Sequence, residues 1–278
     1  EIPLLPVEAF RDAKLFIADQ KPDLQFQSSG TIGMQRSRHF VKDPEIYRTS
    51  IRRGFDHFYG DDEWVFLAYT PGYQDNPHSS LMYMIRFLID GDGSGLSRFL
   101  PLNAPIDKKL LEAIQKSGRK LMLFGAAFGL MDLAENHPQI LSKGSIIMET
   151  GGMKTHRREI SRDEMHQRLS EAFEVPLQAV HSEYGMTELL SQAYSWGDGW
   201  FHCPHWMKVS IRNPDNPQQE LLAEEEGLIG VMDLANLYSC SFLLTGDKGM
   251  ARDDGAFQVL GRWKPQNLRG CNFLVDSD

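Results

Sequence analysis

The apolar and polar positions in the first two thirds of the chain alternate between helix-like and strand-like stretches. The pair Asp43-Pro44 is typical of a helix start, because aspartate caps a helix and proline suits its first turn. Apolar side chains then recur at helical spacing, at Tyr47, Ile51, Phe55 and Phe58. Gly60 ends this predicted helix, and the apolar run from Trp64 to Tyr69 predicts a buried strand.

The same alternation continues to about residue 200. Asp107 and Gly118 bound a second predicted helix, and the spacing of Ser161 and Glu164 is a capping box that starts a third. Strand-like runs accompany these helices, at Leu24 to Gln27, Lys120 to Phe124, Ser145 to Met148 and Ala179 to Ser182. Alternating strands and helices predict an α/β fold, with layered sheets and flanking helices.

The pattern of apolar and polar residues changes after about Trp200. Short apolar segments are separated there by Gly, Asp and Asn turns, at Leu228 to Leu234, Phe242 to Thr245 and Ala256 to Leu260. This pattern predicts a small β-rich lobe. We therefore divide the chain into an α/β region over residues 1–200 and a β-rich lobe over residues 201–278, packed as one compact unit.

Composition narrows the class of protein. Hydrophobic residues make up 41% of the 278 residues, and the formal net charge of −9 argues against non-specific nucleic-acid binding. Three scattered cysteines, Cys203, Cys240 and Cys271, form neither a disulfide framework nor a zinc motif. The apolar run from Leu81 to Ile89 contains an arginine and is far shorter than the roughly 20 residues that span a bilayer. With no charged-then-apolar leader, we expect a cytoplasmic protein without a membrane span.

The first motif that carries chemistry is Ser28-Ser29-Gly30-Thr31-Ile32-Gly33, directly after a predicted strand. Its glycines allow tight turns with exposed N–H groups, and its hydroxyls add donors, so the segment suits phosphate oxygens. It lacks the ending of a Walker A loop, and alone it is more often a plain polar loop. Arg36, Arg38 and His39 could add positive charge, or could lie on a solvated surface.

The second motif is Ser182-Glu183-Tyr184-Gly185-Met186-Thr187-Glu188, at the end of a predicted strand. Ligands of open α/β sheets bind beyond the carboxyl ends of strands. Here glycine allows close backbone approach, threonine can donate to phosphate, and a carboxylate can hold Mg²⁺, which prefers one or two carboxylates plus phosphates and water. The alternative is an ordinary helix start with glutamate in its first turn.

Two shorter motifs follow, Thr245-Gly246-Asp247 and Gly261-Arg262, with Arg269-Gly270-Cys271 near the end of the chain. A loop aspartate can accept hydrogen bonds from both hydroxyls of a ribose, and an arginine can pair with a phosphate or ribose oxygen. Each motif is short, and the first is by itself a common turn sequence.

In this order and at these separations, the four elements resemble the adenylate-forming superfamily, which includes acyl-CoA synthetases and the adenylation domains of peptide synthetases. The resemblance extends from about Phe26 to Gly270. It implies the large-domain fold of these enzymes and the use of ATP and Mg²⁺. It also implies that residues 1–200 hold the nucleotide and acyl groups, whereas the β-rich lobe carries the ribose-binding and acyl-acceptor segments.

The resemblance implies a role for each matching position. Contacts to the ATP phosphates fall on the first loop, at Ser28, Ser29, Gly30, Thr31 and Gly33. A segment beside the adenine falls on Gly151, Gly152 and Met153. The second motif contributes nucleotide contacts at Tyr184, Gly185 and Met186, a phosphate contact at Thr187 and the magnesium carboxylate at Glu188. Asp247 holds the ribose and Arg262 contacts the nucleotide.

The end of the chain looks like the tail of the LuxE-type acyl-protein synthetases from bacterial luminescence systems. Most members of the superfamily continue into a C-terminal lid with a catalytic lysine, whereas this sequence ends at Asp278. We therefore expect the lid to be lacking and Cys271 to receive the acyl group, with Arg269 and Arg262 as cations that favour its thiolate. The alternative for Cys271 is an inert buried thiol. Ile32 departs from the usual second threonine of the phosphate loop.

These features predict ATP-dependent activation of a carboxylic acid, preferably a fatty acid, followed by thioester formation on the protein's own cysteine. An acyl-accepting reductase or carrier protein is a candidate partner. One alternative is an acyl- or aryl-CoA ligase, or a carrier-protein ligase, whose lid is absent from this sequence. A second alternative is a non-catalytic nucleotide-binding protein of the same fold.

Overall fold

The main feature of the fold is a six-stranded, mostly parallel sheet. The computed structural model describes residues 2–17, 21–28, 36–71, 76–151 and 160–263. The strand order is β5-β4-β6-β7-β8-β9, and only β9 runs antiparallel to its neighbour. The strands are β4 (Trp64–Tyr69), β5 (Arg98–Phe99), β6 (Lys120–Ala126), β7 (Ile146–Thr150), β8 (Val180–Tyr184) and β9 (Ala193–Ser195).

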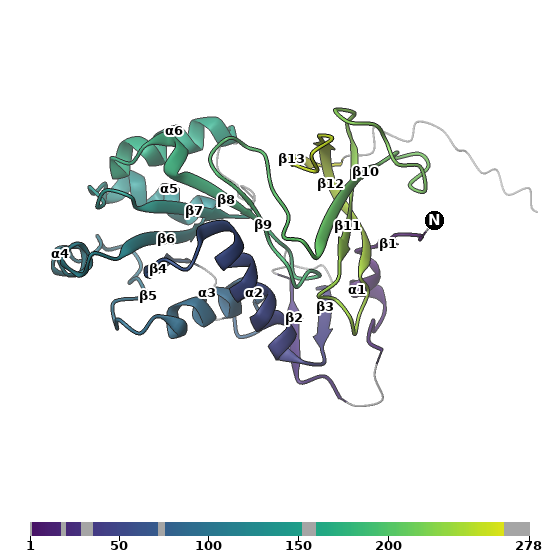
Figure 1. Cartoon of the computed structure of the whole chain (residues 1–278), viewed down its shortest axis with the longest axis horizontal. Coiled ribbons are helices and arrows are strands. Elements are labelled where there is room, and N and C mark those ends of the chain that lie inside the picture. The colour runs from purple at the N-terminus through teal and green to yellow at the C-terminus, as the bar shows by residue number, and fades with distance from the viewer. Residues whose placement is uncertain (1, 18–20, 29–35, 72–75, 152–159, 264–278) are drawn as a thin grey trace, which may run out of the picture.

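Helices cover both faces of this sheet (Figure 1). On one face, α2 (Pro44–Tyr59) and α3 (Ser80–Gly91) bury a cluster rich in aromatic side chains. The other face packs a mainly aliphatic cluster against three helices, α4 (Lys108–Ser117), α5 (Ala127–Asn136) and α6 (Arg162–Phe173). The central strands are therefore buried on both sides, which explains why β4 is apolar throughout.

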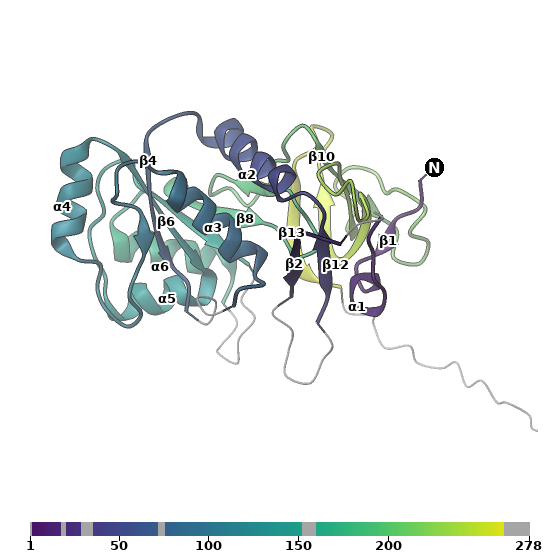
Figure 2. The same ribbon diagram turned by 90° about the horizontal axis from the view of Figure 1, so that it is seen from below.

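A second sheet lies beside the first and contains the last strands of the described chain (Figure 2). Its order is β1-β12-β11-β10. β13 also pairs with β12, along residues 247–251, beyond the residues that pair with β1. These strands are β1 (Leu5–Pro6), β10 (Met207–Arg212), β11 (Gly227–Asp233), β12 (Phe242–Ala251) and β13 (Phe257–Arg262). Because β1 comes from the start of the chain, the sheet joins both ends of the described sequence.

The remaining elements are short. A hairpin of β2 (Leu24–Gln27) and β3 (Arg38–Val41) forms its own two-stranded sheet, and α1 (Ala9–Asp12) and a 3₁₀ turn (Leu177–Ala179) complete the chain. No helix in the described ranges is long and apolar enough to cross a membrane. The division of the chain into two regions near residue 200 stays a prediction.

Several local predictions are confirmed. β4 covers the predicted strand from Trp64 to Tyr69, and α2 begins after Asp43, whose carboxylate accepts the backbone N–H of Glu45 at 2.9 Å. Ser161 caps α6 by accepting the N–H of Glu164 at 3.1 Å. These caps satisfy donors that a helix start leaves unpaired, so they fix where each helix begins.

Candidate active site

The second predicted motif lies at the carboxyl end of β8, one of the parallel strands. β8 ends at Tyr184, and the chain then turns through Gly185, Met186, Thr187 and Glu188 without starting a helix, so the alternative of a helix start is wrong. A β-carbon at Gly185 would lie 2.4 Å from Oε1 of Glu183, so a larger residue there would require that side chain to shift. This is the edge of a parallel sheet at which ligands bind.

Asp247 brings the third and fourth motifs to this edge. Its Oδ2 accepts a hydrogen bond of 3.0 Å from the hydroxyl of Tyr184, and its Oδ1 lies 3.1 Å from Nε of Arg262. The expectation of a loop aspartate is wrong, because Thr245, Gly246 and Asp247 lie inside β12, where Asp247 pairs in register with Arg262 on β13. A buried strand position fixes the carboxylate more rigidly than a loop would.

His39 connects the hairpin that flanks the predicted phosphate loop to the same turn. Its Nδ1 lies 2.8 Å from the carbonyl oxygen of Thr187, so Nδ1 carries the proton and donates it. Its Nε2 then accepts from the hydroxyl of Ser239 at 2.9 Å. Burial lowers the pKa of His39 to about 4, so the ring is neutral near pH 7. Both alternatives for His39 are therefore wrong, because the neutral ring adds no positive charge and, at 1% exposure, it does not lie on a solvated surface.

The end of β11 and the turn that follows it hold the second motif in place through hydrogen bonds. The side-chain amide of Asn236 donates to the carbonyl oxygen of Glu188 at 2.8 Å. Asp233, which is fully buried, accepts from the backbone N–H of Leu190 at 2.8 Å and from the hydroxyl of Ser191 at 2.6 Å. Burial raises the pKa of Asp233, against these hydrogen bonds. Sequence reasoning gave these residues no role.

Two buried glutamates lie under the site, on neighbouring strands. Glu183 on β8 is 8% exposed, and burial raises its pKa to about 8, with a further contribution from Glu149 on β7. Glu149 has its own partners, Nε of Arg162 at 3.4 Å and Nε2 of His166 at 3.7 Å. At neutral pH the floor of the site therefore holds a mostly protonated carboxylic acid, which sequence reasoning missed.

The comparisons with known proteins agree with this geometry. The family model for acyl-protein synthetase, LuxE, matches residues 86–277. The chain belongs to this LuxE family. No curated protein matches it in sequence.

Solved structures of adenylate-forming enzymes share the fold of this LuxE-family chain. ATP-bound MatB from Rhodopseudomonas palustris has a TM-score of 0.60 at 16% identity, over 88% of this chain and 49% of that one. MenE, the O-succinylbenzoate coenzyme A synthetase of Bacillus subtilis, with ATP and a magnesium ion, has a TM-score of 0.57 at 18% identity, over 86% and 49%. The luciferase-like enzyme of the Zophobas morio mealworm has a TM-score of 0.58 at 21% identity, over 96% of this chain and 63% of that one. The chain thus spans about half the length of MatB and MenE.

The first motif of this LuxE-family chain lies only partly within the described residues. Ser28 directly follows β2. Its hydroxyl oxygen accepts the backbone N–H of Ser37 at 3.0 Å, which links the two strands of the hairpin just beyond their paired residues. Gly151 follows β7 with a φ of 73°, a conformation that favours glycine. The other predicted positions lie outside the described residues: Ser29, Gly30, Thr31, Gly33, Gly152, Met153, Arg269 and Cys271.

The two described cysteines do not resemble nucleophiles. Burial raises the pKa of Cys203 to about 12, so its thiol stays protonated at neutral pH. The thiol of Cys240 donates to the carbonyl oxygen of Phe242 at 3.3 Å. His181 stacks on Tyr59, and burial lowers its pKa to about 4. These side chains are structural.

Proposed function

We propose that this protein activates a carboxylic acid with ATP and then transfers the acyl group to its own Cys271. The observation that carries the proposal is a set of direct contacts among the motifs. Tyr184, Asp247 and Arg262 form one chain of polar contacts, and His39 links the hairpin that carries Ser28 to Thr187. Motifs that are far apart in sequence therefore meet at one edge of the parallel sheet.

Asp247 fits a ribose. A carboxylate has about four acceptor sites, and the described contacts of Asp247 use one from Tyr184 and one from Arg262. Two hydroxyls of a ribose would donate to the remaining lone pairs. The side chain of Arg262 is 53% exposed, so its guanidinium would reach a phosphate or ribose oxygen while Nε stays on Asp247.

Glu188 fits a magnesium ion that arrives with nucleotide. In the described ranges, no group of three His, Cys, Asp or Glu side chains could hold a metal by itself. Magnesium bound through one carboxylate, phosphate oxygens and water needs no such group. The ion would offset negative charge on the phosphates. The neighbouring Asn236 holds the backbone carbonyl of Glu188, which limits the positions that its carboxylate can take.

The proposed chemistry proceeds in two displacements. A carboxylate oxygen of the substrate attacks the α-phosphorus of ATP, and pyrophosphate leaves with the electron pair of the broken P–O bond. The thiolate sulfur of Cys271 then attacks the acyl carbon, a thioester bond forms, and AMP leaves. The thiol proton passes to solvent before this second step. A fatty acid is the substrate that we favour, and a reductase or carrier protein would take the acyl group onward.

The test combines two measurements on the full chain. Exchange of labelled pyrophosphate into ATP, with a panel of fatty, short and aromatic acids, detects adenylate formation. Intact mass after incubation with ATP and Mg²⁺ detects the acyl thioester, which hydroxylamine removes. We expect Cys271→Ser to keep the exchange and lose the labile acyl group, with Cys240→Ser as a matched control that keeps both.

The other outcomes discriminate the alternatives. An acyl thioester of equal yield in Cys271→Ser would overturn self-acylation at this residue. Release of AMP that requires coenzyme A would indicate a CoA ligase. The absence of exchange with every acid would overturn adenylation and support a non-catalytic nucleotide-binding protein.

A further inference from the structure

The turn that carries Glu188 takes its position from elements outside itself. Residues 185–192, which connect β8 to β9, form neither a helix nor a strand. A backbone hydrogen bond lies inside the turn, from the N–H of Leu189 to the carbonyl oxygen of Met186 at 3.1 Å. Buried backbone groups need partners, so the rest of the turn depends on side chains from other elements.

Two residues at the end of β11 and just after it hold this turn. The side-chain amide of Asn236 donates to the carbonyl oxygen of Glu188, and the carboxylate of Asp233 accepts the backbone N–H of Leu190. Asn236 therefore fixes Glu188 directly, whereas Asp233 acts on it through the two residues of chain between Glu188 and Leu190. The proposed function does not use Asp233.

The carboxylate of Asp233 is committed to contacts inside the protein. The residue is 0% exposed. Besides Leu190, it accepts the hydroxyl of Ser191 at 2.6 Å and the backbone N–H of Ala235 at 3.0 Å, and the backbone of Ser191 adds a further hydrogen bond. A carboxylate has about four acceptor sites. An amide in its place would lose acceptor sites and turn an N–H group towards one of these donors.

The contacts of Asp233 continue into a buried polar network that reaches α2. The hydroxyl oxygen of Ser191 lies 3.1 Å from that of Ser50 on α2. The indole N–H of Trp206 lies between them, with Nε1 at 3.0 Å from the oxygen of Ser191 and 3.2 Å from that of Ser50. Both serines are buried. The network therefore ties the turn to a strand of the second sheet and to a helix on the first.

Two leucines anchor the same turn in separate apolar clusters. Leu189 packs in the cluster that includes Tyr184, and Leu190 packs in the aromatic cluster under α2 and α3. These contacts should keep the turn in its place after the loss of one polar contact. Hydrogen bonds are directional and apolar burial is not, so the polar contacts decide the orientation of the turn.

We propose that Asp233 is a positioning residue for the magnesium carboxylate: it orients the turn so that Glu188 meets the metal that accompanies the nucleotide. This inference rests on the proposed function, in which Glu188 holds Mg²⁺. Asp233 acts through Leu190 and Ser191 rather than through contact with the ligand. Its loss therefore weakens the part of nucleotide binding that depends on metal and leaves the part that does not.

The test measures binding of α,β-methylene-ATP, which cannot form an adenylate, to the full chain by isothermal titration calorimetry. Titrations in excess Mg²⁺ and in EDTA give two dissociation constants, and their ratio is the metal factor. We expect a metal factor of roughly ten for the natural protein and of roughly one to two for Asp233→Asn. The dissociation constant in EDTA should change less than about two-fold, whereas a general loss of structure would weaken binding in both buffers.

A double-mutant cycle identifies the residue through which Asp233 acts. Glu188→Gln should abolish the metal factor, and Asp233→Asn added to it should weaken binding in Mg²⁺ by less than about two-fold more. Asp247→Ala serves as the comparison, because the proposed function places Asp247 on the ribose. Its loss and that of Asp233→Asn should multiply, as for independent sites.

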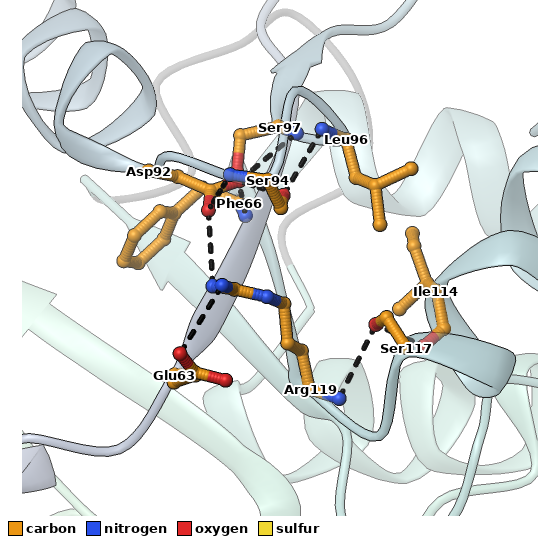
Figure 3. A network of polar contacts seen from close by, with 9 residues as sticks. All are labelled: Glu63, Phe66, Asp92, Ser94, Leu96, Ser97, Ile114, Ser117 and Arg119. Carbon is orange, nitrogen blue, oxygen red and sulfur yellow. Dashed lines mark hydrogen bonds and ion pairs between the residues drawn. The ribbon is translucent and has the colours of Figure 1, made fainter.

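Asp92 is the matched control at the amino edge of the parallel sheet, where β4 and β6 begin (Figure 3). Its side chain is 1% exposed and accepts the hydroxyl of Ser97 at 2.6 Å. Arg119 lies 3.2 Å from this carboxylate and 3.2 Å from that of Glu63. Asp92→Asn thus removes a buried, hydrogen-bonded carboxylate, as Asp233→Asn does. It should lower the midpoint of thermal unfolding and leave both dissociation constants unchanged.

Ser191→Ala keeps the test decisive where Asp233→Asn does not fold. It removes one contact of Asp233 and should lower the metal factor roughly three-fold. An unchanged metal factor in these variants, equal weakening with and without Mg²⁺, or losses that multiply with Glu188→Gln would overturn this inference alone. A natural protein that binds nucleotide equally well in EDTA would overturn the role of Glu188 as well, and one that binds none would overturn the proposed function.

Discussion

The two edges of the parallel sheet differ in how far apart in sequence the partners of their polar contacts lie. At the carboxyl edge the partners are distant in sequence: Tyr184 and Asp247 are 63 residues apart, and His39 and Ser239 are 200 apart. At the amino edge the separations are smaller, such as five residues between Ser97 and Asp92 and 56 between Arg119 and Glu63. The carboxyl edge buries His39, Glu183 and Asp247, whereas Asp56 and Asp61 at the amino edge are exposed.

This difference teaches where each edge is sensitive. Distant partners align only when all three sheets are in place, so the geometry of the carboxyl edge reports on the whole fold. Its buried groups have shifted pKa values, which couple their protonation to folding. The exposed carboxylates at the amino edge can be changed with smaller effects on the fold.

The largest effect should come from Glu183. Its pKa is about 8 in the folded chain against 4.5 for the ordinary carboxyl. As pH rises from 4.5, the unfolded state ionises first, so the free energy of unfolding contributed by Glu183 falls until about pH 8. Glu183→Gln should remove this loss, a difference on the order of 3 to 5 kcal/mol across the window.

Urea denaturation at a series of pH values measures that effect as a difference between the variant and the natural protein. The comparison with the natural protein is needed because other groups also change stability with pH. The pKa values of His39 and His181 are about 4, so these residues lower the free energy of unfolding as pH falls below 6.5, whereas Glu183 lowers it as pH rises. Asp56→Asn, at the amino edge, should leave the slope nearly unchanged. Parallel curves for Glu183→Gln and the natural protein would contradict a raised pKa.

The next effect concerns catalysis at the carboxyl edge. Asp247→Ala should lower kcat/KM for ATP in pyrophosphate exchange about 100-fold, because hydrogen bonds to a charged group contribute about 1.5–3 kcal/mol each. Tyr184→Phe removes one of its described contacts and should cost less, about five-fold. Exchange at the natural rate in Asp247→Ala would show that the carboxylate does not anchor the nucleotide.

Sequence reasoning found the elements that have local signals. α2, α4 and α6 carry a capping aspartate or serine at their starts, and the stretch from Trp64 to Tyr69 is apolar throughout. α5 was missed because its N-cap, Ala126, provides no side-chain hydrogen bond. The run from Leu81 to Ile89 was considered only as a membrane span, although Ser79 caps α3 by accepting from Met82.

The candidate site divides in the same way. Tyr184, Asp247 and Arg262 were predicted from the resemblance, and their contacts are consistent with the roles proposed for them. Asp233 and Asn236 received no role, because their contacts to Leu190 and Glu188 span 43 and 48 residues of chain. Protonation states were out of reach for the same reason, since burial depends on the whole fold.

A moderate effect on stability should come from Arg119 at the amino edge. Arg119→Met leaves the buried carboxylate of Asp92 without its cation, and should lower the free energy of unfolding by about 1–3 kcal/mol. Glu63→Gln, which removes the partner whose side chain is 72% exposed, should cost less than about 0.5 kcal/mol. Equal losses in urea denaturation would show that Asp92 does not depend on Arg119.

The smallest effect should come from Lys120, which pairs with Asp62 at the start of β6. Both side chains are about half exposed, at 50% and 48%, so water screens their attraction. Lys120→Met should lower the free energy of unfolding by about 0.5 kcal/mol or less, and about 0.5 M salt should remove the difference. Lys116→Met, on the exposed surface of α4, is the matched control. A salt-independent loss would instead assign the effect to packing, because the ammonium group of Lys120 also lies 5.5 Å from the ring centroid of Trp64.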